Sequence, residues 1–221
     1  MIGVKIMFEL IQLQAAQILT VALLTILLSL ILTPIAHKLA LVDVPNARKS
    51  HKNPTPRIGG MCIFLACGLS LFVFGNSLGQ NSRTLFVATS LFLLLGVLDD
   101  LFDLKASVKL LSQVIISCIF IVLTGLQVTN FGVFFGLGNA FEFGFLSLPF
   151  TILAIVGLTN AFNMIDGCDG LAASLVGLAI LALLYFGSSQ FEFLTQIYLL
   201  MLVMSIFVFL FFNFFTNPAL K

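Results

Sequence analysis

Long apolar stretches separated by short polar segments dominate the chain. A helix needs about 20 predominantly apolar residues to cross the hydrocarbon core of a bilayer, and about seven stretches approach this length. Their approximate bounds are Ile11–Thr33, Ile58–Phe74, Thr84–Leu98, Val108–Gly125, Phe145–Met164, Leu171–Gly187 and Leu194–Phe215, the third being the shortest. The pattern predicts an all-α, polytopic integral membrane protein, and we expect residues 1–221 to form a single membrane domain.

Composition and charge exclude several classes of protein. Hydrophobic residues make up 60% of the 221 residues and charged residues 9%, which is far from a soluble globular composition. A net charge of +1 gives no electrostatic reason to expect a nucleic-acid partner. The four cysteines form no C-x-x-C pair, so neither a disulfide framework nor a zinc site is favoured. Membrane lipids are therefore the expected surroundings, with no nucleic acid bound.

The basic residues predict the orientation, because Lys and Arg accumulate in short cytoplasmic loops. With the N-terminus outside, only Lys5 and Arg83 of the ten basic residues lie outside, whereas all six aspartates lie inside. An aspartate at the bilayer midplane costs roughly 2.5–3.5 kcal/mol. We therefore expect the aspartates at a wet cytoplasmic interface, where loops held close by a helical bundle can share one polar site. The outer connection from Leu126 to Leu146 is compatible with a short hairpin.

Three cytoplasmic segments carry the candidate chemistry. The first, Asp43–Gly60 (DVPNARKSHKNPTPRIGG), interleaves basic residues with prolines, which can stiffen a loop that holds cations in place. Gly59 and Gly60 allow the backbone to approach a ligand or a neighbouring helix closely. The alternative is a plain loop that only obeys the charge rule.

The second segment, Gly96–Asp103 (GVLDDLFD), ends a predicted span with adjacent carboxylates. Keeping Asp99 and Asp100 both ionised at a partly dehydrated helix end requires a metal ion or nearby cations. A row of polar residues that could grip a phosphate follows at i, i+4 and i+8 on one helical face. The row consists of Lys105, Lys109 and Gln113. The alternative is a solvated helix end with an incidental acidic pair.

The third segment, residues 160–171 (NAFNMIDGCDGL), repeats an amide or carboxylate side chain at every third position, so a helix would align these groups in one polar stripe. The four residues are Asn160, Asn163, Asp166 and Asp169. Such groups suit the hydrogen-bond donors of a sugar, ribose or base, or a hydrated divalent cation. The alternative is that the carboxylates only cap the next helix.

In this order and on one membrane face, the three segments resemble those of the polyprenyl-phosphate N-acetylhexosamine-1-phosphate transferase family, which includes phospho-N-acetylmuramoyl-pentapeptide transferase. DVPNARKSHKNPTPRIGG is similar to the family's first cytoplasmic loop, GVLDDLFDLKASVKLLSQ to its Asp-Asp segment, and NAFNMIDGCDGLAASL to its N-x-x-N-x-x-D-G-x-D-G-L-A signature. The P-R-x-G-G element, without the G-T-P-T-M-G-G of the peptide-transferring branch, favours the undecaprenyl-phosphate N-acetylglucosamine branch.

The resemblance implies that a polyprenyl (undecaprenyl) phosphate attacks the β-phosphorus of a UDP-sugar, with UDP-N-acetylglucosamine favoured, and releases UMP. It implies catalytic and Mg²⁺-binding roles for Asp99 and Asp100, with Mn²⁺ as the alternative hard cation. The implied substrate-binding residues are Lys52, Arg57, Lys109, Asn163, Asp166 and Asp169. The implied location is a bacterial-type plasma (inner) membrane with a cytoplasmic active face, where the product starts a cell-envelope glycan. A homodimer is compatible with the sequence.

The sequence departs from the family pattern at its C-terminus. Family members have a ten-to-eleven-helix fold and continue, after a segment like Asn217-Pro218-Ala219, into a Phe-x-Gly-Asp loop and a His-rich loop. The resemblance assigns the principal magnesium ligand and phosphate-binding histidines to those loops. We therefore expect a truncated chain, comprising the N-terminal part of the catalytic domain, that is inactive alone.

Three other function classes remain as alternatives. A transporter or channel would require polar groups near mid-membrane, and the predicted spans contain almost none. A CDP-alcohol phosphotransferase would also use aspartates and magnesium, but its D-G-x-x-A-R motif is not present. A non-catalytic remnant of the transferase family is the third.

Overall fold

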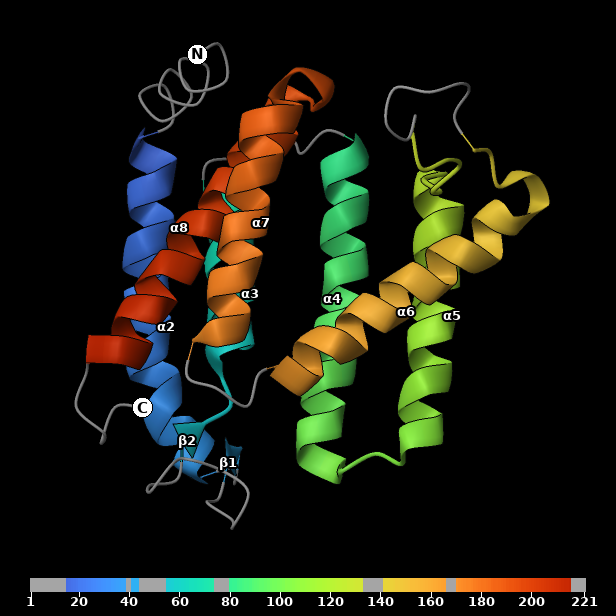
Figure 1. The fold of residues 1–221 in the computed structure, drawn as a ribbon. Coiled ribbons are helices and arrows are strands. Elements are labelled where there is room, and N and C mark those ends of the chain that lie inside the picture. The colour runs from blue at the N-terminus through green and yellow to red at the C-terminus, as the bar shows by residue number, and fades with distance from the viewer. Residues whose placement is uncertain are drawn as a thin grey trace. The chain divides into compact units, whose positions relative to one another are not determined.

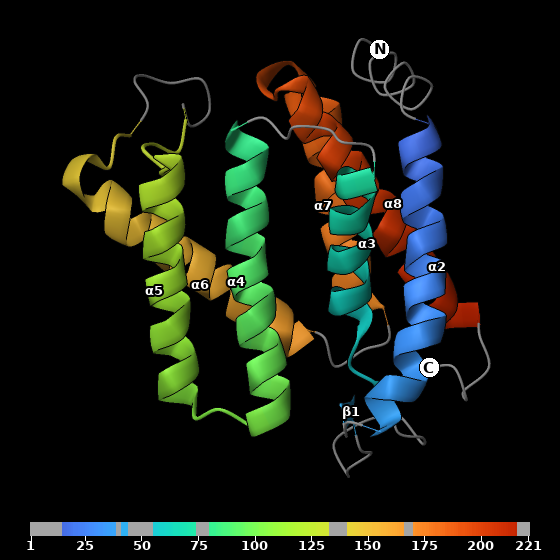
Figure 2. The same ribbon diagram turned by 180° about the vertical axis from the view of Figure 1, so that it is seen from behind.

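The computed structural model describes residues 15–38, 41–43, 55–73, 80–132, 141–165 and 170–215. Seven α-helices make up most of these residues (Figures 1 and 2). They are α2 (Ala15–Lys38), α3 (Gly59–Val73), α4 (Gln80–Phe102), α5 (Ala106–Thr124), α6 (Ser147–Ile165), α7 (Leu171–Gly187) and α8 (Phe193–Phe215). Two 3-10 turns, η2 (Gly144–Leu146) and η3 (Ser188–Gln190), precede α6 and α8. Each predicted apolar stretch coincides with one helix, which confirms the all-α prediction.

Four of the described helices are long and apolar enough to cross a bilayer: α2, α5, α8, and α6 together with η2. Helices α3 and α7 are apolar but have only 15 and 17 residues. Helix α4 has 23 residues, or about 35 Å at the usual helical rise, but polar residues occupy both its ends. The polytopic membrane architecture is confirmed, whereas the predicted number of spans stays a prediction.

Helices α2 and α4 extend furthest beyond the bounds that the apolar pattern predicted. Helix α2 continues from Thr33 through Pro34 to Lys38, which membrane helices tolerate when neighbouring groups satisfy the freed backbone carbonyl. Helix α4 continues from Leu98 through the adjacent carboxylates. An apolar window ends where polar residues begin, but the backbone hydrogen bonds of a helix run on into the membrane interface. The apolar pattern therefore indicates the apolar part of a helix and not the residues at which the helix begins and ends.

The chain divides into two compact units. Unit 1 comprises residues 1–83 and 165–221, and unit 2 comprises residues 84–164. The described part of unit 1 contains α2, α3, α7 and α8, and unit 2 contains α5 with most of α4 and α6. The assignment of the whole chain to one domain stays a prediction.

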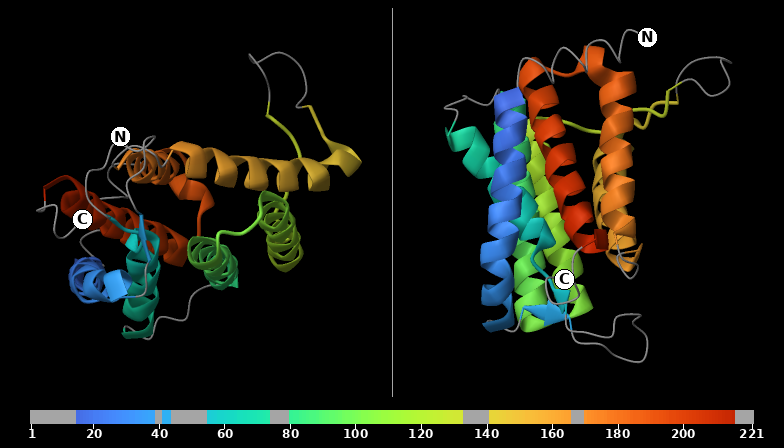
Figure 3. Two further views of the ribbon diagram at one scale, coloured as in Figure 1. Left: turned by 90° about the horizontal axis from the view of Figure 1, so that it is seen from below. Right: turned by 90° about the vertical axis from the view of Figure 1, so that its left-hand side faces the viewer.

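In unit 1, α8 packs against α2, α3 and α7, and α2 also packs against α3 (Figure 3). Thr25 of α2 and Ser205 of α8 are both 0% exposed, and their hydroxyl groups share a hydrogen bond of 2.8 Å. At the start of α3, a Cβ atom on Gly59 would collide with the ring of Phe209. The expected close approach at Gly59 is therefore confirmed, and its partner is a neighbouring helix.

A small antiparallel strand pair closes the first predicted cytoplasmic loop. Strand β1 (Val42–Asp43) pairs with β2 (Thr55–Pro56), and the N–H of Arg57 donates a hydrogen bond of 3.0 Å to the carbonyl of Leu41. The apolar side chains that pack together beside this pair are Ala36, Leu41, Ile58 and Cys62. We did not predict the pair, because two-residue strands leave no periodic pattern. It fixes both ends of the loop, whose residues 44–54 lie outside the described part.

In unit 2, α4 and α5 form a helical hairpin, and a longer connection leads from α5 to α6 (Figure 2). Helix α5 ends at Thr124, and Gly125 caps it with a left-handed φ of 67° and an N–H that donates to the carbonyl of Ile121. The following connection pairs Asn130 with Glu142 in an antiparallel bridge. The hairpin considered for this connection is therefore present at its base.

Replacing Thr25 by valine should destabilise unit 1, because the Ser205 hydroxyl loses its partner between two membrane helices. Such interhelical bonds contribute about 0.6 kcal/mol on average and up to about 1.7 kcal/mol. In detergent, we expect Thr25→Val to lower the free energy of unfolding by an amount in this range. The double variant Thr25→Val/Ser205→Ala should lower it little further. Thr20→Val is the control, because the Thr20 hydroxyl bonds to Ala16 of its own helix. Equal losses in the Thr20 and Thr25 variants would contradict the prediction.

Candidate functional site

The structure distributes the predicted site residues between the two units. Asp99, Asp100, Lys109 and Asn163 lie in the described part of unit 2, whereas Arg57 follows β2 in unit 1. The other predicted substrate-binding residues, Lys52, Asp166 and Asp169, lie outside the described residues. The geometry of the candidate site is therefore that of unit 2.

An ion pair joins the last turn of α4 to the first turn of α5. Lys109 Nζ donates a hydrogen bond of 2.6 Å to Asp99 Oδ2, and the two side chains are only 22% and 23% exposed. A charge-assisted bond at this depth is stronger than a neutral one and less screened by salt than a pair at the surface. Lys109 thus supplies the nearby cation that the sequence analysis expected for Asp99.

The connection between the helices explains why residues ten positions apart meet. Helix α4 ends at Phe102 and α5 begins at Ala106, and two helices with so short a connection must lie side by side. Asp103 makes the turn with a left-handed φ of 48°, a conformation that aspartate adopts more readily than most residues. The last turn of α4 therefore faces the first turn of α5.

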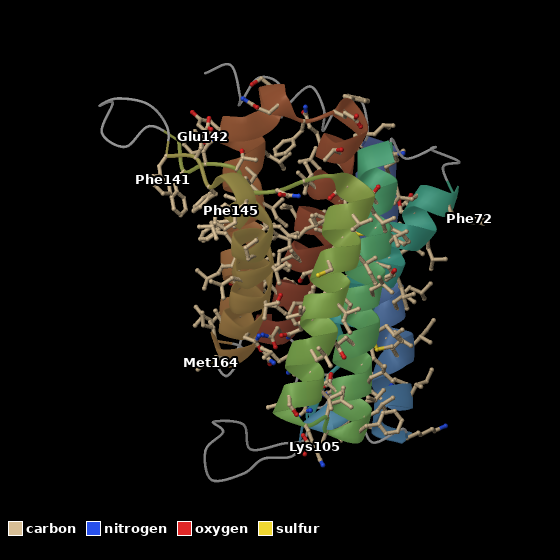
Figure 4. The ribbon with its side chains drawn as sticks, turned by 90° about the vertical axis from the view of Figure 1, so that its right-hand side faces the viewer. Phe72, Lys105, Phe141, Glu142, Phe145 and Met164 are labelled. Carbon is tan, nitrogen blue, oxygen red and sulfur yellow. The ribbon has the colours of Figure 1, made fainter. Side chains whose placement is uncertain are left out.

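Three further charged side chains are exposed around the ion pair: Asp100, Asp103 and Lys105. In Figure 4, Lys105 lies at the same end of unit 2 as Met164, whereas Phe141, Glu142 and Phe145 lie at the opposite end. The C-terminal ends of α4 and α6 therefore share one end of unit 2. Asp166 and Asp169 lie outside the described residues, so the expectation that the acidic turn and the Asn-Asp stripe reach a common membrane face stays a prediction.

A second polar link joins α5 to α6. Gln113, one turn beyond Lys109, is 1% exposed, and its Oε1 accepts a hydrogen bond of 2.7 Å from Asn160 Nδ2. Because its side chain is buried against α6, Gln113 does not belong to a row that grips phosphate, and that part of the sequence prediction is wrong. The spacing correctly placed Gln113 on the face of Lys109 but did not show which helix covers that face.

Asn160 and Asn163 lie on one face of α6, as the spacing of the third segment predicted. Asn160 is half-buried and bonded to Gln113, whereas Asn163 is exposed near the helix end. The bond from Asn160 to α5 was not predicted, because a polar stripe does not reveal which of its members faces a neighbouring helix. The role of Asn163 stays a prediction.

The described carboxylates fit part of a magnesium site. Magnesium is usually bound through one or two carboxylates and completed by waters and substrate phosphates, and Asp99 and Asp100 provide such an oxygen pair at the end of α4. Within the described ranges there is no cluster of three or more His, Cys, Asp or Glu side chains that could hold a metal ion. These two residues would therefore hold the ion only together with further ligands.

Comparison with known proteins identifies the class. Residues 82–219 match the family model described as glycosyl transferase family 4. A probable undecaprenyl-phosphate N-acetylglucosaminyl 1-phosphate transferase of Bacillus subtilis is 39% identical over 205 residues, which cover 90% of this chain and 55% of the relative. An undecaprenyl-phosphate alpha-N-acetylglucosaminyl 1-phosphate transferase of Thermotoga maritima is 31% identical over 172 residues, which cover 78% of this chain and 51% of the relative.

The chain belongs to glycosyl transferase family 4, which confirms the family predicted from the three cytoplasmic segments. A relative in Yersinia pestis with the same printed name as the Thermotoga protein is 31% identical over 163 residues, covering 71% of this chain and 43% of the relative. The chain spans about half the length of these curated relatives.

Replacing Lys109 by methionine should destabilise unit 2 more than removing both charges in Asp99→Asn/Lys109→Met. The single variant leaves a partly buried carboxylate unpaired, whereas the double variant does not. We expect a coupling free energy of about 1 kcal/mol between the two positions, measured by unfolding in detergent. Lys105→Met is the matched control, because Lys105 is exposed one turn earlier. Additive effects of the Asp99 and Lys109 substitutions would contradict a stabilising ion pair.

Proposed function

We propose that this chain takes part in the transfer of N-acetylglucosamine-1-phosphate from a UDP-sugar to undecaprenyl phosphate, with release of UMP. The observation that carries the proposal is the 39% identity over 205 residues to the Bacillus subtilis relative. The acidic turn with its paired lysine supports it, because transfer between two phosphate-bearing substrates requires cationic groups at fixed positions.

The chemistry requires little acid–base catalysis from the protein. A phosphate monoester has a second pKa of about 6, so the attacking oxygen of the lipid phosphate is already mostly deprotonated at neutral pH. What remains is to bring the two substrates together and to neutralise the charge of their phosphates. Residues that position and neutralise are therefore the ones expected in the site.

Lys109 is suited to neutralise the lipid phosphate. Its ammonium group has three donors, of which the bond to Asp99 Oδ2 uses one. Asp99 thus fixes the cation in place, and the other two donors suit phosphate oxygens. When bound, magnesium would neutralise the diphosphate, and Asp99 and Asp100 are the described residues that would hold it, with Mn²⁺ as the alternative.

The remaining predicted site residues are assigned to binding of the sugar nucleotide. We assign nucleotide binding to Asn163, exposed at the end of α6, and to Asp166 and Asp169 beyond it. Lys52 and Arg57 lie in or beside the basic loop that β1 and β2 close, and they would add positive charge for the phosphates. The proposed location is the bacterial plasma (inner) membrane with this site at the cytoplasmic face, where basic loops accumulate.

A chimera tests the transfer directly. Residues 1–221 replace the matching part of the Bacillus subtilis relative, and UMP release from UDP-N-acetylglucosamine and undecaprenyl phosphate is measured in detergent. We expect transfer by the chimera, and a loss of at least about 100-fold for Asp99→Asn or Asp100→Asn, because each removes charge that positions the phosphates or the metal ion.

The control variant for this assay is Glu142→Gln, since Glu142 lies at the opposite end of unit 2 (Figure 4). It should leave transfer unchanged. Wild-type turnover by both aspartate variants would remove their catalytic assignment, and a chimera that inserts into the membrane but releases no UMP would overturn the proposed function. The chain assayed alone tests the expectation that it is inactive by itself.

Cysteine labelling tests the proposed sidedness of unit 2. In intact cells, a membrane-impermeant maleimide should label Glu142→Cys, because Glu142 is predicted to lie outside. Ser107→Cys, in the exposed first turn of α5, should be labelled only after the membrane is permeabilised. Labelling of the Ser107 variant in intact cells would contradict the cytoplasmic placement of the acidic turn.

A further inference from the structure

Consecutive turns of α5 make polar contacts with different helices of unit 2. Lys109 is bonded to Asp99 of α4, and Gln113, four residues later, is bonded to Asn160 of α6. Both bonds are made by side chains on the same face of α5, because residues four apart are neighbours on a helix. Helix α5 is therefore linked by side-chain bonds to both α4 and α6.

The side chains of Gln113 and Asn160 are held in a fixed geometry by burial and hydrogen bonding. The Gln113 side chain is 1% exposed, and a buried amide without a partner is costly in an apolar environment. Asn160 Nδ2 makes two bonds, one of 2.7 Å to Gln113 Oε1 and one of 2.8 Å to the carbonyl of Val156 in its own helix. Since an amide nitrogen has two hydrogens, these bonds use both and fix the direction of the Asn160 side chain.

The link lies one helical turn from the groups assigned to the substrates. Lys109 precedes Gln113 by four residues on α5, which is about 6 Å along the helix axis, and Asn163 follows Asn160 by three residues on α6, or about 4.5 Å. If α6 slides or rotates against α5, Asn163 moves with it relative to Lys109. The bond thus joins the two helices at positions one turn away from Lys109 and Asn163.

We propose that Gln113 is a positioning residue that, through Asn160, holds α6 in one register against α5 and so fixes Asn163 relative to Lys109. The inference rests on the proposed function for what the two groups bind, but the register itself does not depend on it. A displacement of about 1 Å between reacting groups can cost about 100-fold in rate, so loss of the link should lower turnover although Gln113 touches no substrate.

A distance measurement tests the register without any activity. Spin labels are placed on Ser107→Cys and on Met164→Cys, both exposed, in a chain whose four native cysteines are replaced by serine. We expect one narrow distance distribution for this protein, and a shifted or clearly broadened one for Gln113→Met. Asn160→Leu removes the donor instead of the acceptor and should have the same effect.

Two further variants separate positioning from a general loss of packing. The reversed pair Gln113→Asn/Asn160→Gln keeps one long and one short amide and should restore the narrow distribution. Ser117→Ala should leave it unchanged, because the equally buried Ser117 hydroxyl bonds to the Gln113 carbonyl within its own helix. An unchanged distribution in both Gln113→Met and Asn160→Leu would overturn the proposal.

Kinetics in the chimera with the Bacillus subtilis relative test the consequence. Gln113→Met should lower kcat by about tenfold or more, with the pH profile unchanged because the link is neutral, and the reversed pair should recover most of the loss. A shifted distance distribution with wild-type kcat would overturn the positioning role. If the wild-type chimera releases no UMP, the proposed function fails, whereas the distance measurements still decide the register.

Discussion

The ion pair between Lys109 and Asp99 resolves a charge conflict at the end of α4. Asp99 and Asp100 are adjacent carboxylates in the last turn of a helix, where the helix dipole already disfavours negative charge. A lysine 2.6 Å away compensates the nearer carboxylate, and the short α4–α5 connection holds that lysine in place. Unit 2 therefore has two adjacent aspartates and a lysine held in place at one end.

The same face of α5 combines a charged link with a neutral one. Near the helix end, where water has access, α5 uses the lysine, and one turn deeper it uses the Gln113 amide, which is almost fully buried. This order follows the cost of burial, since an amide is far cheaper to desolvate than an ammonium group. At the opposite end of unit 2, the N–H of Val128 donates to the buried Thr151 hydroxyl, and Phe143 stacks on Phe150. From the candidate site toward the opposite end of unit 2, the contacts between segments thus change from an ion pair to neutral hydrogen bonds and aromatic stacking.

The sequence predicted the parts of this arrangement that depend on composition and spacing. Seven apolar stretches gave seven helices, and two adjacent aspartates indicated the need for the cation that Lys109 supplies. The sequence did not predict which helix lies against Gln113, because Gln113 and Asn160 are far apart in the chain and meet only in the folded structure. The β1–β2 pair was missed for a similar reason, since its register depends on how Leu41 and Arg57 are brought together. Contacts between distant segments leave no local pattern to read.

The charge at this end of unit 2 limits what it can bind by itself. The turn between α4 and α5 has three carboxylates, on Asp99, Asp100 and Asp103, and two ammonium groups, on Lys105 and Lys109, which leaves one negative charge. A phosphate monoester brings a further charge of about −1.5 to −2, and the diphosphate of a sugar nucleotide adds more. Electrostatic attraction of the two proposed substrates therefore requires positive charge in addition to that of this turn. A divalent cation held by Asp99 and Asp100 would supply such charge at the turn itself.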